Sequence, residues 1–527
     1  MHTQKTLLWA ALTCAAVLAA GCSHGDKDSG ADTNTGSTRG ALIQNPPART
    51  GSLNAADLNT QLNRASGGPI LLAVAGAPAC GVDYHYIQYA TVGGAGEPTT
   101  ATGVLMVPTG SAAPCTGPRP IVLYGHSTSA AKTYNLAAVN DTSNPSYGEW
   151  VLLSAMFAAQ GYIVVAPNYA GYDASMLTYH PYLNADQQSK DMIDALTAAR
   201  SALGHIFAAG TTDNGKLFVT GYSQGGYVAM ATQRAMQELG QTVTASVPMS
   251  GPYALEAMGD ATILGAVSFG ATLFIPMITS SYQHSYGDLY SSASDFYEDP
   301  YAAWVDSLLP STTPLGTLAD QGKLPRLALF SNTPPVTGNA TLDSLLAVPT
   351  DPIYASAFGT GNLIKNSARA AYAADILASP DGALPAFAQS GAPLAANPTY
   401  PLRVKLNLND MRKGGFAPQA PTLLCGGSED PTVSFDLNTR TMAAFWAPLN
   451  LPAGRVTVLD LETGLGAGDP YTSAEQGFEL AKAALVVQAV AGGATDGGAE
   501  AVAEAYHSGL VPTFCMQAAR GFFGQFQ

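Results

Sequence analysis

Residues 216–238, KLFVTGYSQGGYVAMATQRAMQE, decide the fold. They open with an apolar run typical of a buried strand, 217–220, and close with a run of helical spacing, 226–238. The pentapeptide between these runs, 221–225, has the pattern G-x-S-x-G. That pattern alone is weak because the chain is rich in glycine, with 55 among 527 residues. Its place between a strand and a helix makes it specific, and we predict a sharp turn that presents Ser223 as a nucleophile.

The sequence on both sides of this turn alternates between strand-like and helical runs. Such alternation is typical of a largely parallel sheet that helices cover on both faces. It stops after residue 250, and a long segment rich in Pro, Tyr and Ala with helical spacing follows before it resumes. The strand-like runs are 82–92, 100–108, 119–127, 162–172, 216–223, 244–250, 420–427 and 455–461, and helices are expected at 191–203, at 474–490 and, as a final short helix, near the carboxyl end.

The strand, turn and helix around Ser223 resemble the nucleophile elbow of the α/β-hydrolase superfamily. The resemblance covers roughly residues 82–251 and 419–520. It implies an α/β fold, with a mostly parallel central sheet, helices on both faces, and a large, mainly helical cap inserted after the sixth strand. The expected divisions are a signal peptide at 1–21, a polar tether at 22–50, a first core part at 51–251, a cap at 252–418 and a second core part at 419–527.

The superfamily also implies a chain order of serine, acid and histidine, which sorts the histidines. Six of the eight precede Ser223, so His284 and His507 remain. His284 lies inside the cap segment, whereas His507 follows the last strand, where the family places its base. About 46 residues separate that strand from His507, more than in most members. We expect His507 to remove the serine proton.

The acid is expected in the loop after the strand at 420–427. Asp430 lies there, with glycines before it and a proline after it, which suits a tight loop that aims a carboxylate at the imidazole. Glu429 is the adjacent competitor. We expect Asp430 to hold the tautomer of His507 and to stabilise the imidazolium that forms during catalysis.

The oxyanion of the tetrahedral intermediate needs hydrogen-bond donors. The resemblance implies one from the backbone N–H of Gln224, the residue after the nucleophile. The second is expected from the loop after the third strand, residues 124–128, which looks like a His-Gly-x oxyanion loop with Ser127 in the place of the glycine. The donor there is Ser127 or Thr128, and His126 is expected to orient the loop.

The amino terminus is typical of an export signal. Lys5 precedes an apolar run at 7–20 that is too short to form a stable transmembrane helix. The run leads into Leu-Ala-Ala-Gly-Cys at 18–22, which resembles the lipobox of bacterial lipoproteins and implies that Cys22 is lipidated. An ordinary signal peptide cut nearby is the alternative. We expect a protein exported and anchored to the cell envelope, at the outer membrane in a Gram-negative cell, or secreted.

Export determines how the remaining cysteines are interpreted. Cys80, Cys115, Cys425 and Cys515 show no CxxC or zinc-site spacing, and disulfides are expected in an oxidising compartment. Of the three pairings that four cysteines allow, we favour 80 with 115 and 425 with 515. The second bond would tie the loop of the acid to that of the histidine. Packing as small apolar residues is the alternative.

Aromatic residues concentrate in the cap, with seven among residues 282–304. They either line a substrate pocket or pack a small helical subdomain. The pocket residues that we expect are Tyr286 and Tyr290 from this segment, together with Tyr222 beside the nucleophile.

The net charge of the chain and its family resemblance reduce the number of functions that we expect. A net charge of −15 disfavours a nucleic-acid partner. The elbow, the large cap and the run GYIVVAPNYAGY at 161–172 resemble the secretory lipase group, which implies a hydrophobic ester substrate and no metal or organic cofactor. We expect a monomeric serine carboxylester hydrolase, held at the membrane by its lipid. The rivals are a secreted aminopeptidase and a catalytically silent surface binding module. The acidic cap residues that would hold a peptide amine are Asp288, Asp295, Glu298 and Asp299.

Overall fold

The computed structural model describes residues 38–206, 210–466 and 468–527. A nine-stranded sheet lies at the centre of this part of the chain, in the order β1-β2-β3-β5-β4-β6-β7-β8-β9. The three strand pairs from β1 to β5 are antiparallel and the five from β5 to β9 are parallel. The strands are β1 Ala48–Leu53, β2 Gly81–Val92, β3 Pro98–Thr109, β4 Gly117–Gly125, β5 Ile163–Pro167, β6 Thr211–Tyr222, β7 Ala245–Met249, β8 Thr422–Gly426 and β9 Val456–Asp460.

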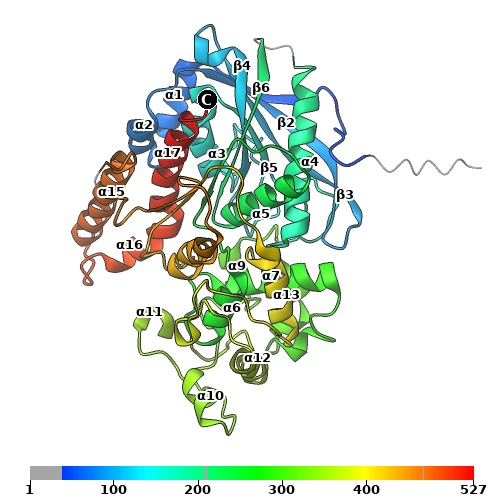
Figure 1. Cartoon of the computed structure of the whole chain (residues 1–527), viewed down its shortest axis with the longest axis vertical. Coiled ribbons are helices and arrows are strands. Elements are labelled where there is room, and N and C mark those ends of the chain that lie inside the picture. Colours follow the sequence, from blue (N-terminus) through cyan, green and yellow to red (C-terminus); the bar gives the residue numbers. More distant parts are fainter. Residues whose placement is uncertain (1–37, 207–209, 467) are drawn as a thin grey trace, which may run out of the picture. The chain divides into compact units, whose positions relative to one another are not determined.

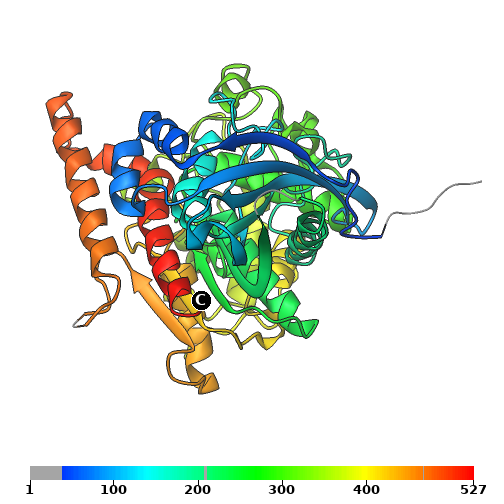
Figure 2. The same ribbon diagram turned by 90° about the horizontal axis from the view of Figure 1, so that it is seen from above.

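Helices cover both faces of the sheet (Figures 1 and 2). α4 and α5 pack on one face, and α3 and α17 pack on the other. Every residue of β5, β7 and β8 is buried, as expected of strands between two helical layers. The α/β fold predicted from the alternation is confirmed. The helices outside the cap are α1 Ala55–Arg64, α2 Gly68–Ala75, α3 Tyr147–Met156, α4 Ala185–Leu203, α5 Gln224–Glu238, α14 Thr441–Trp446, α15 Thr472–Ala491, α16 Ala499–Ala505 and α17 Val511–Gly524.

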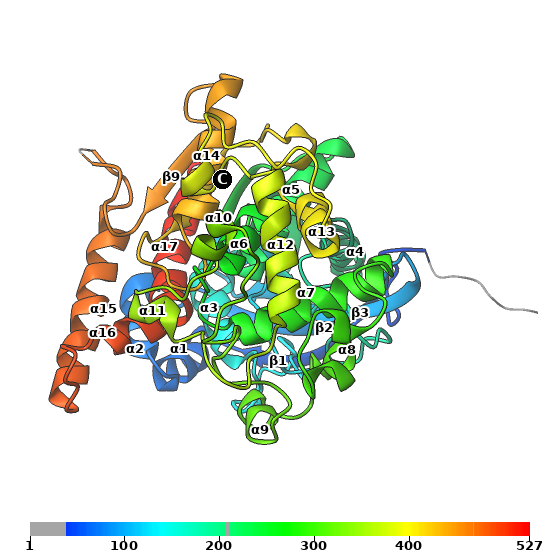
Figure 3. The ribbon, with the colours of Figure 1, turned by 90° about the horizontal axis from the view of Figure 1, so that it is seen from below.

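The segment between β7 and β8 folds as a set of helices gathered at one end of the sheet (Figure 1), and Figure 3 shows this set end on. It follows the seventh strand rather than the sixth, because β1 precedes the strands that the pattern predicts. The polar sequence of β1, ARTGSL, gave no strand signal. The cap helices are α6 Leu255–Ile263, α7 Ala271–Tyr286, α8 Val305–Leu308, α9 Leu315–Asp320, α10 Ala340–Leu345, α11 Pro352–Ala355, α12 Asn366–Ala378 and α13 Pro401–Asn409.

The expected tether, residues 22–50, reaches too far into the folded part. The backbone N–H groups of Gly40 and Ile43 donate to the carbonyl oxygens of Ala90 and Gln88 at 2.8 Å, so the chain already lies along the sheet edge there. The signal peptide at 1–21, Cys22 and the tether as far as residue 37 lie outside the described residues. None of the helices in the described ranges is both long and apolar enough to cross a membrane.

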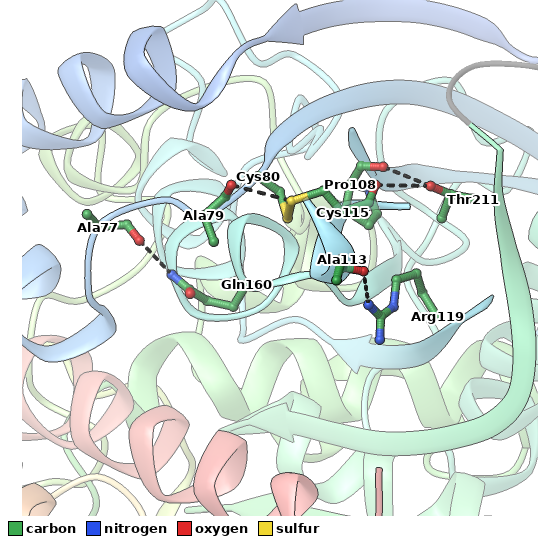
Figure 4. Close-up of a disulfide and its surroundings, with 9 residues drawn as sticks. All are labelled: Ala77, Ala79, Cys80, Pro108, Ala113, Cys115, Arg119, Gln160 and Thr211. Atoms are coloured by element: carbon green, nitrogen blue, oxygen red, sulfur yellow. Dashed lines mark hydrogen bonds between the residues drawn. A yellow bond between two sulfur atoms is a disulfide. The ribbon is translucent and has the colours of Figure 1, made fainter. Parts of the chain in front are cut away.

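Both predicted disulfides are present. Cys80 at the amino end of β2 bonds to Cys115, and Cys425 at the end of β8 bonds to Cys515 in α17. Figure 4 shows the first bond, beside which the Thr211 hydroxyl donates to the carbonyl oxygens of Pro108 and Cys115. Because each bond joins segments that are distant in sequence, each restricts the unfolded chain.

A buried cluster of charges joins the cap helices to one another. Arg403 of α13 donates two hydrogen bonds to Asp260 of α6, both at 2.8 Å, and Arg412 bridges Asp381 and Asp410. Glu256 of α6 lies in the same cluster and is fully buried. Its Oε2 accepts from Asn407 and from the N–H of Ala395, whereas its Oε1 has no hydrogen-bond partner among the described residues. Burial, reinforced by Asp381 and Asp260, raises the pKa of Glu256 to about 8.

This pKa predicts that the stability of the cap depends on pH. Glu256 holds its proton more tightly in the folded than in the unfolded protein, because the folded pKa is raised above the ordinary value of 4.5. The contribution of Glu256 to the free energy of unfolding is therefore complete below pH 4.5 and is lost as the pH rises to about 8. We expect the melting temperature to fall across this window in the wild type and to fall less in Glu256→Gln, which mimics the protonated group. Parallel pH profiles for the two proteins would contradict the prediction.

Candidate active site

The Ser223 turn joins β6 to α5 with a strained backbone. Ser223 has φ 58° and ψ −121°, a combination that non-glycine residues rarely adopt. A Cβ on Gly225 would lie 1.8 Å from the carbonyl oxygen of Gly125, and one on Gly221 would lie 2.2 Å from that of Gly225. The glycines are therefore needed for β4, β6 and α5 to approach one another. The turn holds the Ser223 hydroxyl at the carboxyl end of the sheet.

His507 and Asp430 lie beside this hydroxyl. The Nε2 atom of His507 is 2.8 Å from Ser223 Oγ, and its Nδ1 atom is 2.6 Å from Asp430 Oδ2. The other oxygen of Asp430 accepts the N–H groups of Thr432 and Val433 at 2.9 and 3.0 Å. Those two bonds fix the carboxylate so that Oδ2 faces the imidazole. The structure therefore brings together the three side chains that the sequence predicts as a triad.

The two competing side chains lie elsewhere. Glu429 pairs with Lys482 at 2.9 Å and is largely exposed. His284 of α7 lies in the cap, where its Nδ1 is 2.9 Å from the carbonyl oxygen of Ser280 and its ring stacks on Tyr179. Neither residue contacts Ser223.

His507 lies on a π-helical turn, Tyr506–Leu510, between α16 and α17. Tyr222, expected to line the pocket, donates its hydroxyl hydrogen to the carbonyl oxygen of His507. The ring of Tyr222 does line a cavity, but its hydroxyl is committed to holding the main chain of His507. The Cys425–Cys515 bond adds a covalent connection between the strand before Asp430 and the helix after His507.

Gln224, the first residue of α5, is fixed by a buried histidine. Its Nε2 lies 2.7 Å from Nε2 of His180, and Nδ1 of His180 lies 2.8 Å from the carbonyl oxygen of Ala170. Burial lowers the pKa of His180 to about 3, so the ring is neutral: Nδ1 donates to the carbonyl and Nε2 accepts from Gln224. The backbone N–H of Gln224 lies in the first helical turn, where N–H groups have no partner within the helix.

The structure decides between Ser127 and Thr128, the two candidates for the second oxyanion donor. The N–H of Ser127 donates to Glu149 Oε1 at 3.0 Å, and its hydroxyl donates to Oε2 at 3.1 Å. Ser127 is therefore not free to serve the oxyanion. The N–H of Thr128 has no hydrogen-bond partner in the described part of the chain, and its hydroxyl contacts Tyr182 at 2.8 Å.

Glu149 is a site residue that the sequence analysis missed. It also accepts hydrogen bonds from the hydroxyl groups of Tyr124 and Tyr134, both at 2.6 Å, so four donors from three residues converge on it. The sequence carries one sign of its importance, since Glu149 is the one charged residue between positions 142 and 160.

His126 occupies the orienting position expected for it. Its ring is buried and stacks between Tyr134 and Tyr169, with centroids 4.2 and 4.1 Å away. Its nitrogens face the carbonyl oxygens of Ser127 and Asn168, at 2.6 and 3.1 Å. Burial lowers the pKa of His126. The ring supports the loop from within the core and does not contact Ser223.

Two cavities open at Ser223. One is narrow, about 60 Å³, and apolar side chains of the cap line most of it. The other is about 840 Å³ and contains His507, Tyr222 and Glu149. No group of three His, Cys, Asp or Glu side chains with a geometry for a metal ion occurs in the described ranges.

The aromatic cap segment does not line either cavity, so this prediction for Tyr286 and Tyr290 is wrong. Tyr286 accepts a hydrogen bond from Asn409 at 2.9 Å. Tyr290 donates to Asp306 and borders a separate cavity of about 740 Å³. Tyr282 and Tyr297 are buried among the cap helices, which is the packing role that the composition left open.

Comparisons with known proteins agree with this fold. A sequence model of the prolyl oligopeptidase family (Peptidase_S9) matches residues 151–263. The ligand-bound rice cell wall degrading esterase LipA from Xanthomonas oryzae is 26% identical over 93% of this chain and 100% of that chain, with a TM-score of 0.64. A putative hydrolase from Legionella pneumophila is 18% identical over 92% of this chain and 98% of that chain, with a TM-score of 0.59. No curated protein matches the sequence.

The fold is therefore the α/β-hydrolase fold, and fold and relatives together define a serine hydrolase. The esterase LipA is one protein of described function to which this chain is similar over nearly its whole length.

Proposed function

We propose that this protein is an exported serine carboxylester hydrolase of the esterase and lipase type. The observation that carries the proposal is the hydrogen-bonded row of Ser223, His507 and Asp430 where two cavities meet. The similarity to the esterase LipA supports esters as substrates. The apolar lining of the narrow cavity suits a hydrophobic acyl group. The proposed reaction uses no metal or organic cofactor.

In the acylation step, Ser223 attacks the ester carbonyl carbon while its proton passes to His507 Nε2. Asp430 accepts a hydrogen bond from the Nδ1–H group and stabilises the imidazolium. The tetrahedral intermediate then collapses, the bond between the carbonyl carbon and the alcohol oxygen breaks, and the alcohol leaves with the proton from Nε2. An acyl-enzyme on Ser223 remains.

In the deacylation step, water replaces the alcohol. His507 takes a proton from the water as its oxygen attacks the acyl carbon, and the second tetrahedral intermediate forms. Its collapse breaks the bond to Ser223 Oγ, which recovers the proton from Nε2. A carboxylic acid leaves, and the enzyme returns to its starting state.

The negative oxygen of both intermediates is assigned to two backbone donors, the N–H groups of Gln224 and Thr128. His180 holds the side chain of Gln224. Glu149 holds the loop before Thr128, because it accepts hydrogen bonds from the N–H and the hydroxyl of Ser127. Fixed donors of this kind stabilise the transition state because they need no reorganisation during the reaction.

This arrangement predicts a large effect for Glu149, which does not contact Ser223. In Glu149→Ala, the N–H and hydroxyl of Ser127 lose their acceptor, and the Thr128 N–H is expected to leave its position. Loss of one oxyanion donor costs about 10²- to 10³-fold in kcat. We expect that fall for p-nitrophenyl acetate with a KM within about threefold, and substantial recovery in Glu149→Gln, which keeps an acceptor oxygen. Equal losses in the two variants would contradict this positioning role.

Export and anchoring form part of the proposal. The two disulfides are typical of a protein that folds in an oxidising compartment. The apolar run at 7–20 and Cys22 in its lipobox-like context support a lipid anchor at the cell envelope. We propose membership of the secretory lipase group on the basis of the large cap and the nucleophile elbow at Ser223.

A peptidase is the second candidate, because the prolyl oligopeptidase family model matches residues 151–263. The acidic cap residues that an aminopeptidase would use do not favour it. Asp288 and Asp295 border the separate cavity near Tyr290, and neither cavity at Ser223 is lined by Glu298 or Asp299. Glu149 lies close to the site, but four donors already occupy its carboxylate.

The test is a hydrolysis panel with the full-length protein. Wild type and Ser223→Ala are compared on p-nitrophenyl esters of two to sixteen carbons and on aminoacyl p-nitroanilides. We expect ester turnover that depends on Ser223. Turnover of the anilides alone would assign the protein to the peptidases, and no turnover of either set would favour the silent binding module.

A further inference from the structure

The two cavities at Ser223 differ in size and in chemistry. The narrow one, about 60 Å³, runs among the cap helices and is lined mainly by aliphatic side chains. The wide one, about 840 Å³, is lined by hydroxyl-bearing and apolar side chains together with Glu149. An ester placed at Ser223 would extend into both.

Phe274 of α7 lies at the boundary between the two cavities. It lines both of them, whereas its neighbour Leu273 lines the wide one and its neighbour Ile275 lines the narrow one. The ring of Phe274 lies back over Gly270, where a Cβ would be 2.9 Å from the ring atom Cζ. Gly270 also caps the helix with φ 84°, so a larger residue there would meet both backbone strain and the ring.

The position of His507 distinguishes the two sides chemically. His507 and Ser508 line the wide cavity, whereas the narrow cavity is lined by Gln224 and contains neither of them. The alcohol must lie beside the imidazole that protonates it. The wide cavity therefore faces the leaving alcohol, and the narrow one faces the acyl chain.

We propose that Phe274 divides the substrate cleft into an acyl subsite and an alcohol subsite, and that the enzyme prefers esters that join a short apolar acyl group to a large alcohol without negative charge. This inference rests on the proposed function and deepens it. A volume of about 60 Å³ holds roughly four to six water-sized groups, at about 10 to 15 Å³ each. The acyl optimum is therefore expected at about four to six carbons.

The residues that line the alcohol subsite explain why this subsite is large and why it disfavours negatively charged groups. Ala481, Ala484 and Leu485 of α15 form part of it, so the long segment before His507 builds this cavity. Neither Lys nor Arg is among its lining residues in the described ranges, and Glu149 carries the one carboxylate. An anionic alcohol would meet no cation there and would be repelled by Glu149.

The experiment uses the full-length protein and two series of esters. The first varies the acyl chain of p-nitrophenyl esters from two to sixteen carbons. The second keeps a butanoyl group and varies the alcohol, with methanol as a small one, 4-methylumbelliferone as a large neutral one and hydroxypyrene trisulfonate as a large anionic one. We expect kcat/KM to peak at about four to six acyl carbons, and the neutral umbelliferyl ester to exceed the anionic ester by at least tenfold.

Variants of neighbouring residues on α7 test the division. In Phe274→Ala the cavities merge, so the ratio of dodecanoate to butanoate turnover should rise at least tenfold. In Ile275→Trp the ratio of hexanoate to acetate turnover should fall at least tenfold, because the indole fills the acyl subsite. In Leu273→Trp that ratio should hold, while the ratio of umbelliferyl to methyl butanoate turnover falls. Exposed His284 on the same helix lines neither cavity, and His284→Ala should keep every ratio.

Two outcomes would overturn the proposal, and they differ from failure of the proposed function. One is an acyl profile in Phe274→Ala that matches the wild type. The other is an equal loss on all esters in both tryptophan variants, with no change in any ratio. Absence of any Ser223-dependent ester turnover in the wild type would instead reject the ester hydrolase assignment itself.

Discussion

Ser223→Ala is expected to lower kcat on a p-nitrophenyl ester by about 10⁵- to 10⁶-fold while the protein stays folded. The Oγ atom has one hydrogen-bond partner within the described ranges, His507 Nε2, and it bonds to no structural group. The main-chain bond from the Ser223 N–H to the carbonyl oxygen of Met249 survives the change. The variant therefore removes the nucleophile without removing a contact that holds the turn.

His507→Ala is expected to cost nearly as much, and the double variant should be no worse than either single one. The two groups act as a unit, since the base has no function without the nucleophile. The bond from the Tyr222 hydroxyl to the carbonyl oxygen of His507 involves the main chain, so it remains possible in the alanine variant. Measurement of kcat and of melting temperature for the three variants checks this. Additive losses would contradict a triad, as would a drop in melting temperature large enough to unfold the protein.

The sequence predicted the site wherever chain order and local pattern carry the information. Ser223 was found because a strand, a turn and a helix follow one another in the chain. His507 and Asp430 were found because the superfamily resemblance implies the chain order of serine, acid and histidine and the places of the acid and the base after late strands. Export predicted that the four remaining cysteines form disulfides, and the favoured one of the three possible pairings is present. The structure brings all of these groups together.

The parts that failed depend on contacts between distant segments or on side-chain direction. The choice between Ser127 and Thr128 depends on Glu149, which takes one of the two N–H groups and comes from a different helix. Tyr286 and Tyr290 have a composition typical of a pocket, yet composition does not say that their hydroxyls bond to Asn409 and Asp306. Strand β1 is polar because it is an edge strand with most of its residues exposed, so it lacks the apolar alternation that predicts strands.

Asp430→Asn is expected to lower kcat by about 10⁴-fold although the replacement has nearly the same shape. The reason lies in the two N–H groups of Thr432 and Val433, which both donate to Asp430 Oδ1. In the variant the amide oxygen must take that position, since an NH₂ group there would face two donors. The NH₂ group then faces His507 Nδ1, which becomes an acceptor. The proton of the neutral imidazole moves to Nε2, which can no longer accept the hydrogen of Ser223.

Glu429→Gln is the matched control, because it makes the same chemical change at the adjacent position. Glu429 pairs with Lys482 at the surface and does not contact His507, so we expect kcat within about twofold of the wild type. Both variants should keep the wild-type melting temperature within a few degrees, since every backbone bond to Asp430 Oδ1 has a counterpart in the asparagine variant. The loss in Asp430→Asn should be in kcat with KM little changed, because the tautomer affects the transition state and not the binding of the ester. Similar activity in the two variants would mean that the carboxylate at position 430 does not set the tautomer, and that the 2.6 Å contact with Nδ1 has no catalytic role.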